Sequence, residues 1–245
     1  MAPYKFIISY DGSGYSGYQR QGKQKTVQLE LEHALQTIGW TGSSIYAAGR
    51  TDAGVHAEGQ VVAFTFDWRH GVNALQAAVN ANLPDDISVL SAETAEDWFH
   101  PRYDAKWRTY RYLIYCSPVR KPLLDRYAWR VWPEAEFDLM QTAATQLVGR
   151  HDFRAFGKPP RKDGRTERIV RQSEWQALPE HRFLYNVSAN GFLYHMVRRM
   201  VAAQVLVGQE QSAMTELIKA IHGQVDLLPD IAPPNGLVLE SVEYE

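Results

Sequence analysis

The first hundred residues alternate between the hydrophobic period of a strand and that of a helix, and this alternation limits the folds open to the chain. Thr26 is a typical helix N-cap, and Pro84 closes the second helical stretch. The predicted elements are strands at 5–10, 44–48, 60–66 and 87–90 and helices at 27–38 and 72–83. The order strand, helix, strand, strand, helix, strand predicts a split βαβ, or ferredoxin-like, domain.

The second half carries the same kinds of pattern less cleanly, and it predicts another mixed domain. We place the boundary so that residues 1–103 form one domain and residues 104–245 form an α/β domain. A long irregular and basic stretch covers residues 157–168. The predicted elements are strands at 107–116, 126–131, 175–178, 183–188 and 237–242 and helices at 137–147, 196–207 and 212–221.

The composition is that of a globular protein, with 45% hydrophobic and 22% charged residues in 245. No apolar run is long enough for a membrane span or a signal peptide, so we expect a cytoplasmic protein without membrane contact. Cys116 is the only cysteine, which excludes an internal disulfide and a cysteine metal site. The eight histidines lack metal-ligand spacing, so no metal is expected. The glycine-rich stretch 11–17 lacks a phosphate-loop ending, so it is not a nucleotide phosphate-binding loop of that type.

The charges are segregated along the chain although the net charge is only −2. Residues 101–171 hold 16 Lys or Arg against 8 Asp or Glu, whereas residues 1–100 hold 6 against 11. Such a basic block is typical of a surface that binds RNA phosphates, and it is equally typical of a solvated loop. Charge alone leaves both interpretations open.

Asp52 stands out because it lies on the connection between two predicted strands, between Arg50 and Gly54. Connections held by a rigid sheet often carry catalytic side chains. An aspartate beside a glycine is also common in ordinary turns, where its side chain bonds the nearby backbone. The residue alone therefore permits either a catalytic or a turn role.

Several motifs in a fixed order resolve this ambiguity. They are Tyr10-Asp11-Gly12-Ser13-Gly14-Tyr15, Gln19-Arg20-Gln21, Thr26-Val27-Gln28, residues 48–57 around Asp52, Arg108-Thr109-Tyr110-Arg111-Tyr112, His151-Asp152-Phe153, Gly191-Phe192-Leu193 and His195-Met196-Val197-Arg198. With this set the chain resembles the TruA family of tRNA pseudouridine synthases. The match is imperfect at Tyr18, at residues 100–104 and at Arg199-Met200, and none of these is assigned to the chemistry.

The resemblance implies a fold and a reaction. The fold is α+β, with two ferredoxin-like halves that share an extended antiparallel sheet and form a central RNA-binding cleft. The reaction is the isomerisation of uridine to pseudouridine at positions 38 to 40, in the anticodon stem-loop of tRNA. Members of the family work as homodimers, and the reaction requires no cofactor.

The resemblance also assigns roles to individual residues. Asp52 would be the nucleophile, because a carboxylate can form a covalent adduct and then depart. Arg198 would keep that carboxylate ionised, Tyr110 would contact the target base, and Arg50 would support the flipped nucleotide. Leu237 is assigned to substrate binding, and the glycine-rich stretch 11–17 is expected to shape an edge that faces the RNA. By periodicity alone, Arg198 and Arg199 would instead lie on the polar face of a surface helix.

The basic block supplies candidates for contact with the RNA backbone. These are Arg154, Lys158, Arg161, Lys162, Arg165 and Arg168. Two other classes of function compete with the isomerase. A glycosidase or nucleosidase would use Asp52 with a second carboxylate such as Glu58, and a non-catalytic module would bind RNA on the same kind of sheet.

Overall fold

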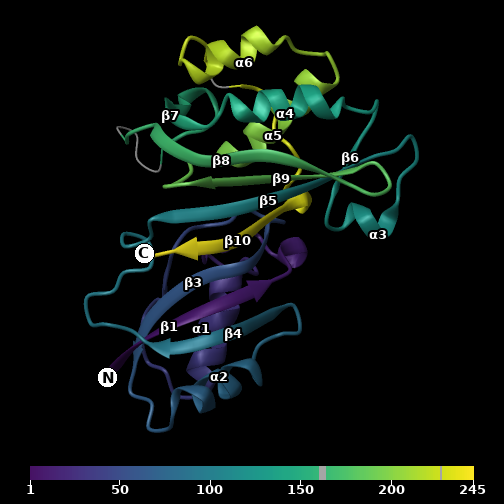
Figure 1. Ribbon diagram of the computed structural model, residues 1–245. Coiled ribbons are helices and arrows are strands. Elements are labelled where there is room, and N and C mark those ends of the chain that lie inside the picture. Colours follow the sequence, from purple (N-terminus) through teal and green to yellow (C-terminus); the bar gives the residue numbers. More distant parts are fainter. Residues whose placement is uncertain (160–163, 227) are drawn as a thin grey trace. The chain divides into compact units, whose positions relative to one another are not determined.

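The computed structural model describes residues 1–159, 164–226 and 228–245. The chain divides into two compact units. The first comprises Met1–Lys106 together with Val238–Glu245, and the second comprises Trp107–Leu237. Each unit combines strands with helices (Figure 1), so the predicted α+β class is confirmed. Among the described residues, no helix has both the length and the apolar character needed to span a bilayer.

The first unit is built on the strand order β4-β1-β3-β10. Its elements are β1 (Ala2–Tyr10), α1 (Val27–Thr37), β2 (Tyr46–Ala47), β3 (His56–Phe66), α2 (Val72–Asn80), β4 (Ile87–Thr94) and β10 (Leu237–Glu243). Strand β1 pairs antiparallel with both β3 and β4, whereas β10 runs parallel to β3, with Val238 opposite His56. The short β2 pairs with β3 farther along, where Tyr46 lies opposite Ala63.

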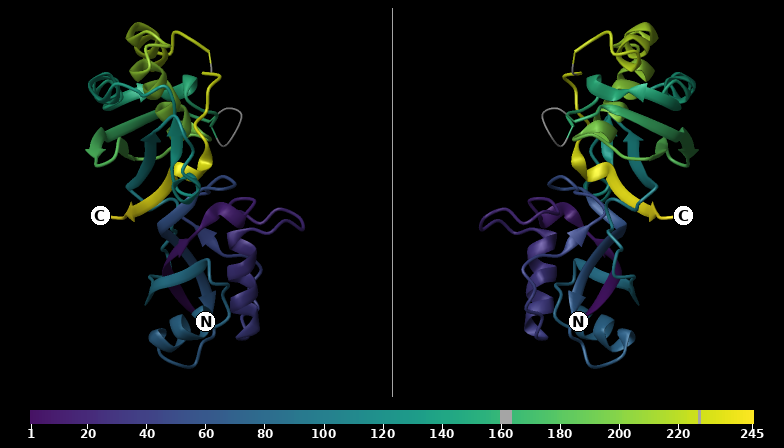
Figure 2. Two further views of the ribbon diagram at one scale, coloured as in Figure 1. Left: turned by 90° about the vertical axis from the view of Figure 1, so that its right-hand side faces the viewer. Right: turned by 90° about the vertical axis from the view of Figure 1, so that its left-hand side faces the viewer.

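Helix α1 begins where the sequence predicts. The Thr26 hydroxyl accepts a hydrogen bond from the Leu29 N–H at 3.4 Å, which satisfies one of the unpaired donors of the first turn. The helix ends at Thr37, and Gly39 then takes a left-handed φ of +97° that favours glycine. Figure 2 shows α1 packed along one face of the strands, toward which it buries an apolar stripe that includes Leu31 and Leu35.

The core of this unit is aromatic and aliphatic. Phe6 and Ile8 of β1 are fully buried, as the strand period predicts for alternate residues. The Phe6 ring meets Phe64 of β3 edge to face, with 4.9 Å between the centroids. Leu75 and Val79 add the buried face of α2. Each such side chain contributes about 1.5–3 kcal/mol when it is fully removed from water.

The second unit has the strand order β5-β9-β8-β7. Its elements are β5 (Trp107–Cys116), α3 (Pro122–Asp125), β6 (Trp129–Val131), α4 (Phe137–Thr145), β7 (Gly149–Asp152), β8 (Glu167–Leu178), β9 (Arg182–Ala189), α5 (Met196–Gly208) and α6 (Met214–Ile221). The pairs β5–β9, β9–β8 and β8–β7 are antiparallel, and β6 runs parallel to β5.

Helices α4 and α5 cover one face of these strands. The Ser173 hydroxyl of β8 bonds the Ala144 carbonyl of α4 at 2.8 Å, and Trp175 Nε1 donates to Gln204 of α5 at 2.8 Å. Tyr185 of β9 is fully buried on the same face and bonds Ser173. Because these polar atoms are paired, they can be buried between sheet and helices without a large desolvation penalty.

Several local predictions differ from the structure, among them those for β2, for β8 and for the segments that form α3 and β7. Strand β2 has only two residues instead of the five predicted at 44–48. Strand β8 begins at Glu167, inside the predicted irregular stretch, because β7 pairs with its charged first residues although these show no apolar alternation. Helix α3 and strand β7 are too short to leave a period in the sequence.

Candidate active site

Asp52 is half-buried on the connection between β2 and β3. The connection closes as a turn, in which the Val55 N–H donates to the Asp52 carbonyl at 3.1 Å and Gly54 has φ of +78°. Its start is tied to β3, since Gln60 Nε2 donates to the Gly49 carbonyl at 3.1 Å. We call residues 49–55 the Asp52 loop. The Gln60 bond holds the start of the loop on β3, and the turn at Asp52–Val55 leads directly into the same strand.

A second segment, residues 10–18, packs against the Asp52 loop and forms hydrogen bonds with it. The Tyr10 and Thr51 hydroxyls lie 2.8 Å apart, and both residues are buried. The Tyr18 N–H donates to the Thr51 carbonyl at 3.1 Å, and the Gly54 N–H donates to the Tyr15 carbonyl at 3.4 Å. The residue that precedes Asp52 is therefore held through both its side chain and its backbone.

Two glycines let this segment approach the loop closely. A Cβ on Gly12 would lie 2.0 Å from the Val55 carbonyl oxygen. A Cβ on Gly17, where φ is +93°, would lie 2.9 Å from the Thr51 carbonyl oxygen. The glycine-rich stretch, expected from sequence to shape an RNA-facing edge, thus packs against the Asp52 loop, a contact that no local pattern indicates.

His56, the first residue of β3, is a buried part of this arrangement that the sequence did not single out. Its Nδ1 accepts the Gly12 N–H at 3.1 Å and lies 3.1 Å from Asp11 Oδ1. The only sequence signal for this contact is that His56 lies in one family motif while Asp11 and Gly12 lie in another.

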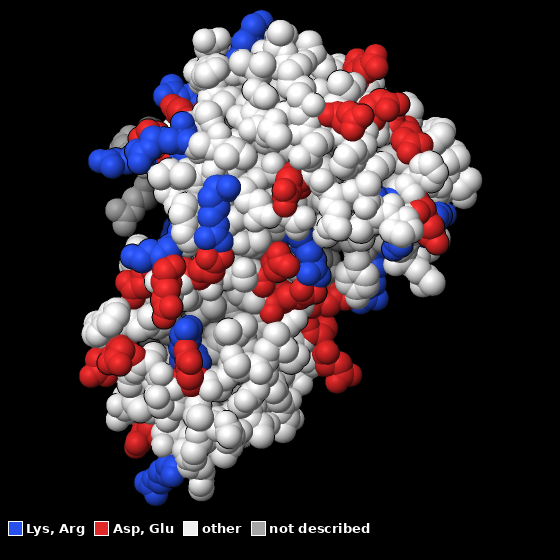
Figure 3. Space-filling view, in the orientation of Figure 1, with Lys and Arg blue, Asp and Glu red and all other residues white. Residues whose placement is uncertain are grey.

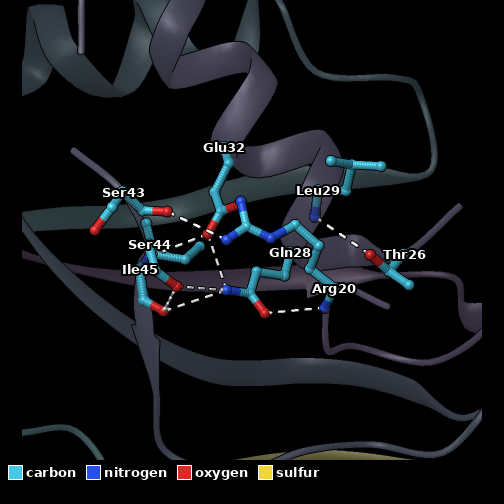
Figure 4. Close-up of polar contacts among 8 residues, drawn as sticks. All are labelled: Arg20, Thr26, Gln28, Leu29, Glu32, Ser43, Ser44 and Ile45. Carbon is cyan, nitrogen blue, oxygen red and sulfur yellow. Dashed lines mark hydrogen bonds and ion pairs between the residues drawn. The ribbon is translucent and has the colours of Figure 1, made fainter. Parts of the chain in front are cut away.

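Figure 4 shows why the Gln19-Arg20-Gln21 and Thr26-Val27-Gln28 motifs matter structurally. The buried Glu32 carboxylate of α1 accepts bonds from Arg20 Nη1 at 2.6 Å, Gln28 Nε2 at 2.9 Å and the Ile45 N–H at 3.1 Å. Gln28 also accepts the Arg20 N–H at 3.0 Å and bonds Ser44 at 2.9 Å. A buried carboxylate with this many donors fixes α1 to the chain that leads into the Asp52 loop.

Arg50 is exposed on the Asp52 loop, and in the described part of the chain its guanidinium has no hydrogen-bond or ion-pair partner. Leu237 is buried at the start of β10. The residue after it, Val238, lies opposite His56, so this end of β10 reaches the strand that follows the Asp52 loop.

Tyr110 lies on β5 in the second unit, opposite Val187 of β9. Its ring is half-buried and meets Phe192 edge to face, with 5.2 Å between centroids. Tyr112, two residues on, is fully buried and donates to the Pro233 carbonyl at 2.7 Å. Tyr112 is therefore a packing residue, whereas Tyr110 is only half-buried.

Arg198 and Arg199 are not on a solvated helix face, so that alternative is wrong. Both are half-buried, and Arg198 Nε donates to the Ala232 carbonyl at 2.7 Å while Arg199 Nε donates to the Leu228 carbonyl at 2.9 Å. The Ala232 N–H in turn donates to the Arg198 carbonyl at 3.1 Å. Burial raises the pKa of Tyr112 well above its usual value, and the positive charge of Arg198 opposes that rise.

The predicted RNA-backbone residues differ in their surroundings. Lys158 and Arg165 are exposed, and Arg168 is half-buried. Arg154 is exposed but bonds the Asp152 carboxylate, at 2.6 Å from its Nε. Arg161 and Lys162 lie outside the described residues. Figure 3 shows basic side chains gathered on the side of the second unit where β7 lies in Figure 1.

Comparison with known proteins identifies the family of this chain. A family model described as tRNA pseudouridine synthase matches residues 6–104 and 143–245. Relatives named tRNA pseudouridine synthase A come from Streptococcus equi subsp. equi, with 37% identity over 100% of both chains, and from Methylacidiphilum infernorum, with 39% identity over 98% of this chain and 95% of the relative.

A structural likeness to a solved Cbf5-Nop10-Gar1 complex is weak and adds nothing to this assignment. Its TM-score is 0.39 at 12% identity, over 83% of this chain and 45% of that one. The match of the family model and the full-length identity of the relatives are decisive. The chain therefore belongs to the tRNA pseudouridine synthase family.

Proposed function

We propose that this tRNA pseudouridine synthase acts on uridines 38 to 40 of the anticodon stem-loop, with Asp52 as its nucleophile. The isomerisation of uridine to pseudouridine in tRNA is the activity of its family. One observation carries the assignment of Asp52. Thr51, the residue directly before this half-buried aspartate, is bonded through its side chain to Tyr10, 41 positions away, and through its backbone to Tyr18. These bonds fix the place of the carboxylate.

The reaction needs few groups from the protein. The bond from C1′ to N1 of the uridine breaks, the detached ring turns, and a bond from C1′ to C5 forms while the proton on C5 leaves and N1 gains one. A carboxylate can carry the intermediate as a covalent adduct and then depart. A carboxylate that is held in place by its loop avoids the cost of ordering it at each turnover.

The remaining site residues have complementary roles in this proposal. The family resemblance assigns to Arg198, whose guanidinium donates to the Ala232 carbonyl, the role of keeping the nucleophile ionised. Tyr110 presents a partly accessible ring against which the target base stacks. Arg50, exposed two residues before Asp52, supports the flipped nucleotide, and Leu237 lines the site with apolar surface.

The homodimer and the absence of a cofactor remain predictions from the family resemblance, and the cytoplasmic location remains a prediction from the sequence. The two-domain division at residue 103 also remains a prediction. A homodimer is tested by light scattering at enzyme concentrations used in the assay, where a monomer mass would contradict it.

Substitution of Asp52 tests the proposal directly. Purified Asp52→Asn protein is incubated with an unmodified tRNA transcript, and pseudouridine is then mapped chemically. We expect turnover to fall by about 10³-fold or more while tRNA affinity stays within about twofold, because the change removes the nucleophile and keeps the loop. Asp67→Asn, an exposed carboxylate just after β3, is the matched control and should retain turnover.

The alternatives give other outcomes in the same assay. Free uracil would reveal a nucleosidase that uses Asp52 with Glu58, whose side chain is exposed on β3. Binding without any pseudouridine in the wild-type reaction would reveal an RNA-binding module. Modification outside positions 38 to 40, in a transcript with cytidine at those positions, would contradict the proposed target.

A further inference from the structure

Two arginines from separate strands converge on one turn of the second unit. Arg108, near the start of β5, donates from Nη1 to the Asn190 carbonyl at 3.0 Å. The side chain of Arg168, near the start of β8, packs against Gly191, the residue after Asn190. A Cβ on Gly191 would lie 3.5 Å from Arg168 Nε. We call Arg108 and Arg168 the arginine pair.

The turn that receives the arginine pair is itself firmly held. The Asn190 N–H donates to the Ile169 carbonyl at 3.0 Å, and the Asn190 side-chain oxygen accepts the Ile169 N–H at 3.0 Å. Arg168 Nη1 also donates to the carbonyls of Arg165 at 2.9 Å and Glu167 at 2.6 Å. Backbone oxygens thus fix both guanidinium groups before any ligand arrives.

Holding two cations close together costs electrostatic energy. Burial lowers the pKa of Arg168, and the positive charge of Arg108 lowers it further. A neighbouring anion relieves such repulsion. A phosphate is well suited, because the planar guanidinium forms paired hydrogen bonds with phosphate oxygens.

The surroundings of the arginine pair are those of a nucleotide and not of a free anion. Tyr110 follows Arg108 by two residues on β5, so both side chains lie on the same face of the strand. Phe192, directly after Gly191, meets the Tyr110 ring at 5.2 Å. Guanidinium groups beside accessible aromatic rings match the phosphates and bases of an RNA chain.

We propose that Arg108 and Arg168 together bind one backbone phosphate of the tRNA substrate, next to the nucleotide that contacts Tyr110. This inference rests on the proposed function, because it takes tRNA as the ligand. It also divides the basic block. In this proposal Arg168 contacts the RNA, whereas Arg154 has a structural role through its bond to Asp152.

The test compares three variants, Arg108→Gln, Arg168→Gln and the double variant, with a matched control. Arg182→Gln is that control, since Arg182 also donates to a backbone carbonyl, that of Pro179 at 3.0 Å, and lies at the opposite end of β9. The affinity for tRNA is measured over a series of salt concentrations, and thermal unfolding of each variant is recorded.

Each single substitution should weaken tRNA binding about tenfold, the usual effect of losing a hydrogen bond to a charged group. The loss of tRNA affinity in the double variant should be much smaller than the product of the two single losses, because both side chains bind the same phosphate. It should also reduce the slope of log affinity against log salt by about 0.7 to 0.9. Arg182→Gln should keep the wild-type affinity and slope.

Other outcomes would overturn the inference. An unchanged salt slope in the double variant, with normal thermal unfolding, would show that the arginine pair binds no phosphate. Fully multiplicative losses would show that the two side chains bind separate groups. If wild-type protein forms no pseudouridine in tRNA, the proposed function fails, whereas active wild-type protein with unaffected variants rejects the phosphate site alone.

Discussion

The hydroxyl of Tyr10 lies 2.8 Å from the hydroxyl of Thr51, the residue directly before Asp52. Tyr10 ends β1 and is 3% exposed, and Thr51 is 7% exposed, so this hydrogen bond forms away from solvent. It joins β1, an inner strand of the first unit, to the Asp52 loop. The position of the proposed nucleophile therefore depends on a buried residue outside the Asp52 loop.

Tyr10→Phe should lower both stability and turnover. The buried Thr51 hydroxyl loses its partner, which costs about 1–3 kcal/mol in the free energy of unfolding. We expect a several-fold lower kcat with little change in tRNA affinity, measured by single-turnover assay and urea denaturation.

Tyr4→Phe provides the matched control on the same strand. Tyr4 is also buried, and among the described residues its hydroxyl makes no hydrogen bond. Equal losses of kcat in the two variants would show that the Tyr10 hydroxyl does not position the loop.

Gly17→Ala should displace the Asp52 loop. The new Cβ would meet the Thr51 carbonyl oxygen at 2.9 Å and the Ala53 nitrogen at 3.3 Å, so the backbone on both sides of Asp52 must move. A misplaced nucleophile lowers turnover steeply, and we expect roughly a tenfold or greater loss of kcat.

Gly39→Ala separates this clash from backbone strain. Gly39 has nearly the same φ, +97°, but a Cβ there meets nothing within 4 Å. Both variants should lose about 1 kcal/mol of stability from the left-handed backbone, and only Gly17→Ala should lose turnover. Comparable turnover in the two would refute the steric argument.

Arg198→Lys should reduce turnover although the positive charge is kept. Lysine lacks the planar fork that lets one guanidinium bond the Ala232 carbonyl and still present other N–H groups. We expect about a hundredfold lower kcat if Arg198 holds the charge of the nucleophile.

Arg199→Lys is the natural comparison, because Arg199 makes the equivalent bond to the Leu228 carbonyl. It should lose similar stability in thermal unfolding while turnover stays within about threefold of wild type. A structural role alone for Arg198 would give the two variants the same kinetics.

Stability should fall in alkaline solution, and Tyr10 should contribute to that fall. Burial raises the pKa of Tyr10 to about 12, and hydrogen bonds from Thr51 and Gln60 only partly offset it. Unfolded tyrosine ionises near pH 10, so above that pH the unfolded state releases a proton that the folded state keeps. The contribution is complete below about pH 10 and is lost as the pH rises through about 12.

Urea denaturation between pH 9 and pH 12 measures this effect. Wild-type protein should lose stability more steeply than Tyr10→Phe, by up to about 1.4 kcal/mol per pH unit. Identical slopes would mean that the Tyr10 phenol is not excluded from solvent in the folded protein.

Local patterns in the sequence determined most of the elements. The strand at 107–116 was predicted with its observed bounds, and α1 begins directly after its Thr26 cap, because burial on one face leaves a period that survives in the chain. The ordered motifs identified the family, and comparison with relatives confirmed it.

Tertiary structure alone decided which of these elements meet. Tyr10 bonds Thr51 across 41 positions, and Arg198 bonds Ala232 across 34. Strand β10, close to the C-terminus, pairs parallel to β3 in the first unit. Hydrophobic period records which face of an element is buried, but it carries no information about the partner that covers that face. The support beneath Asp52 and the arginine pair could therefore be seen only once the chain had folded.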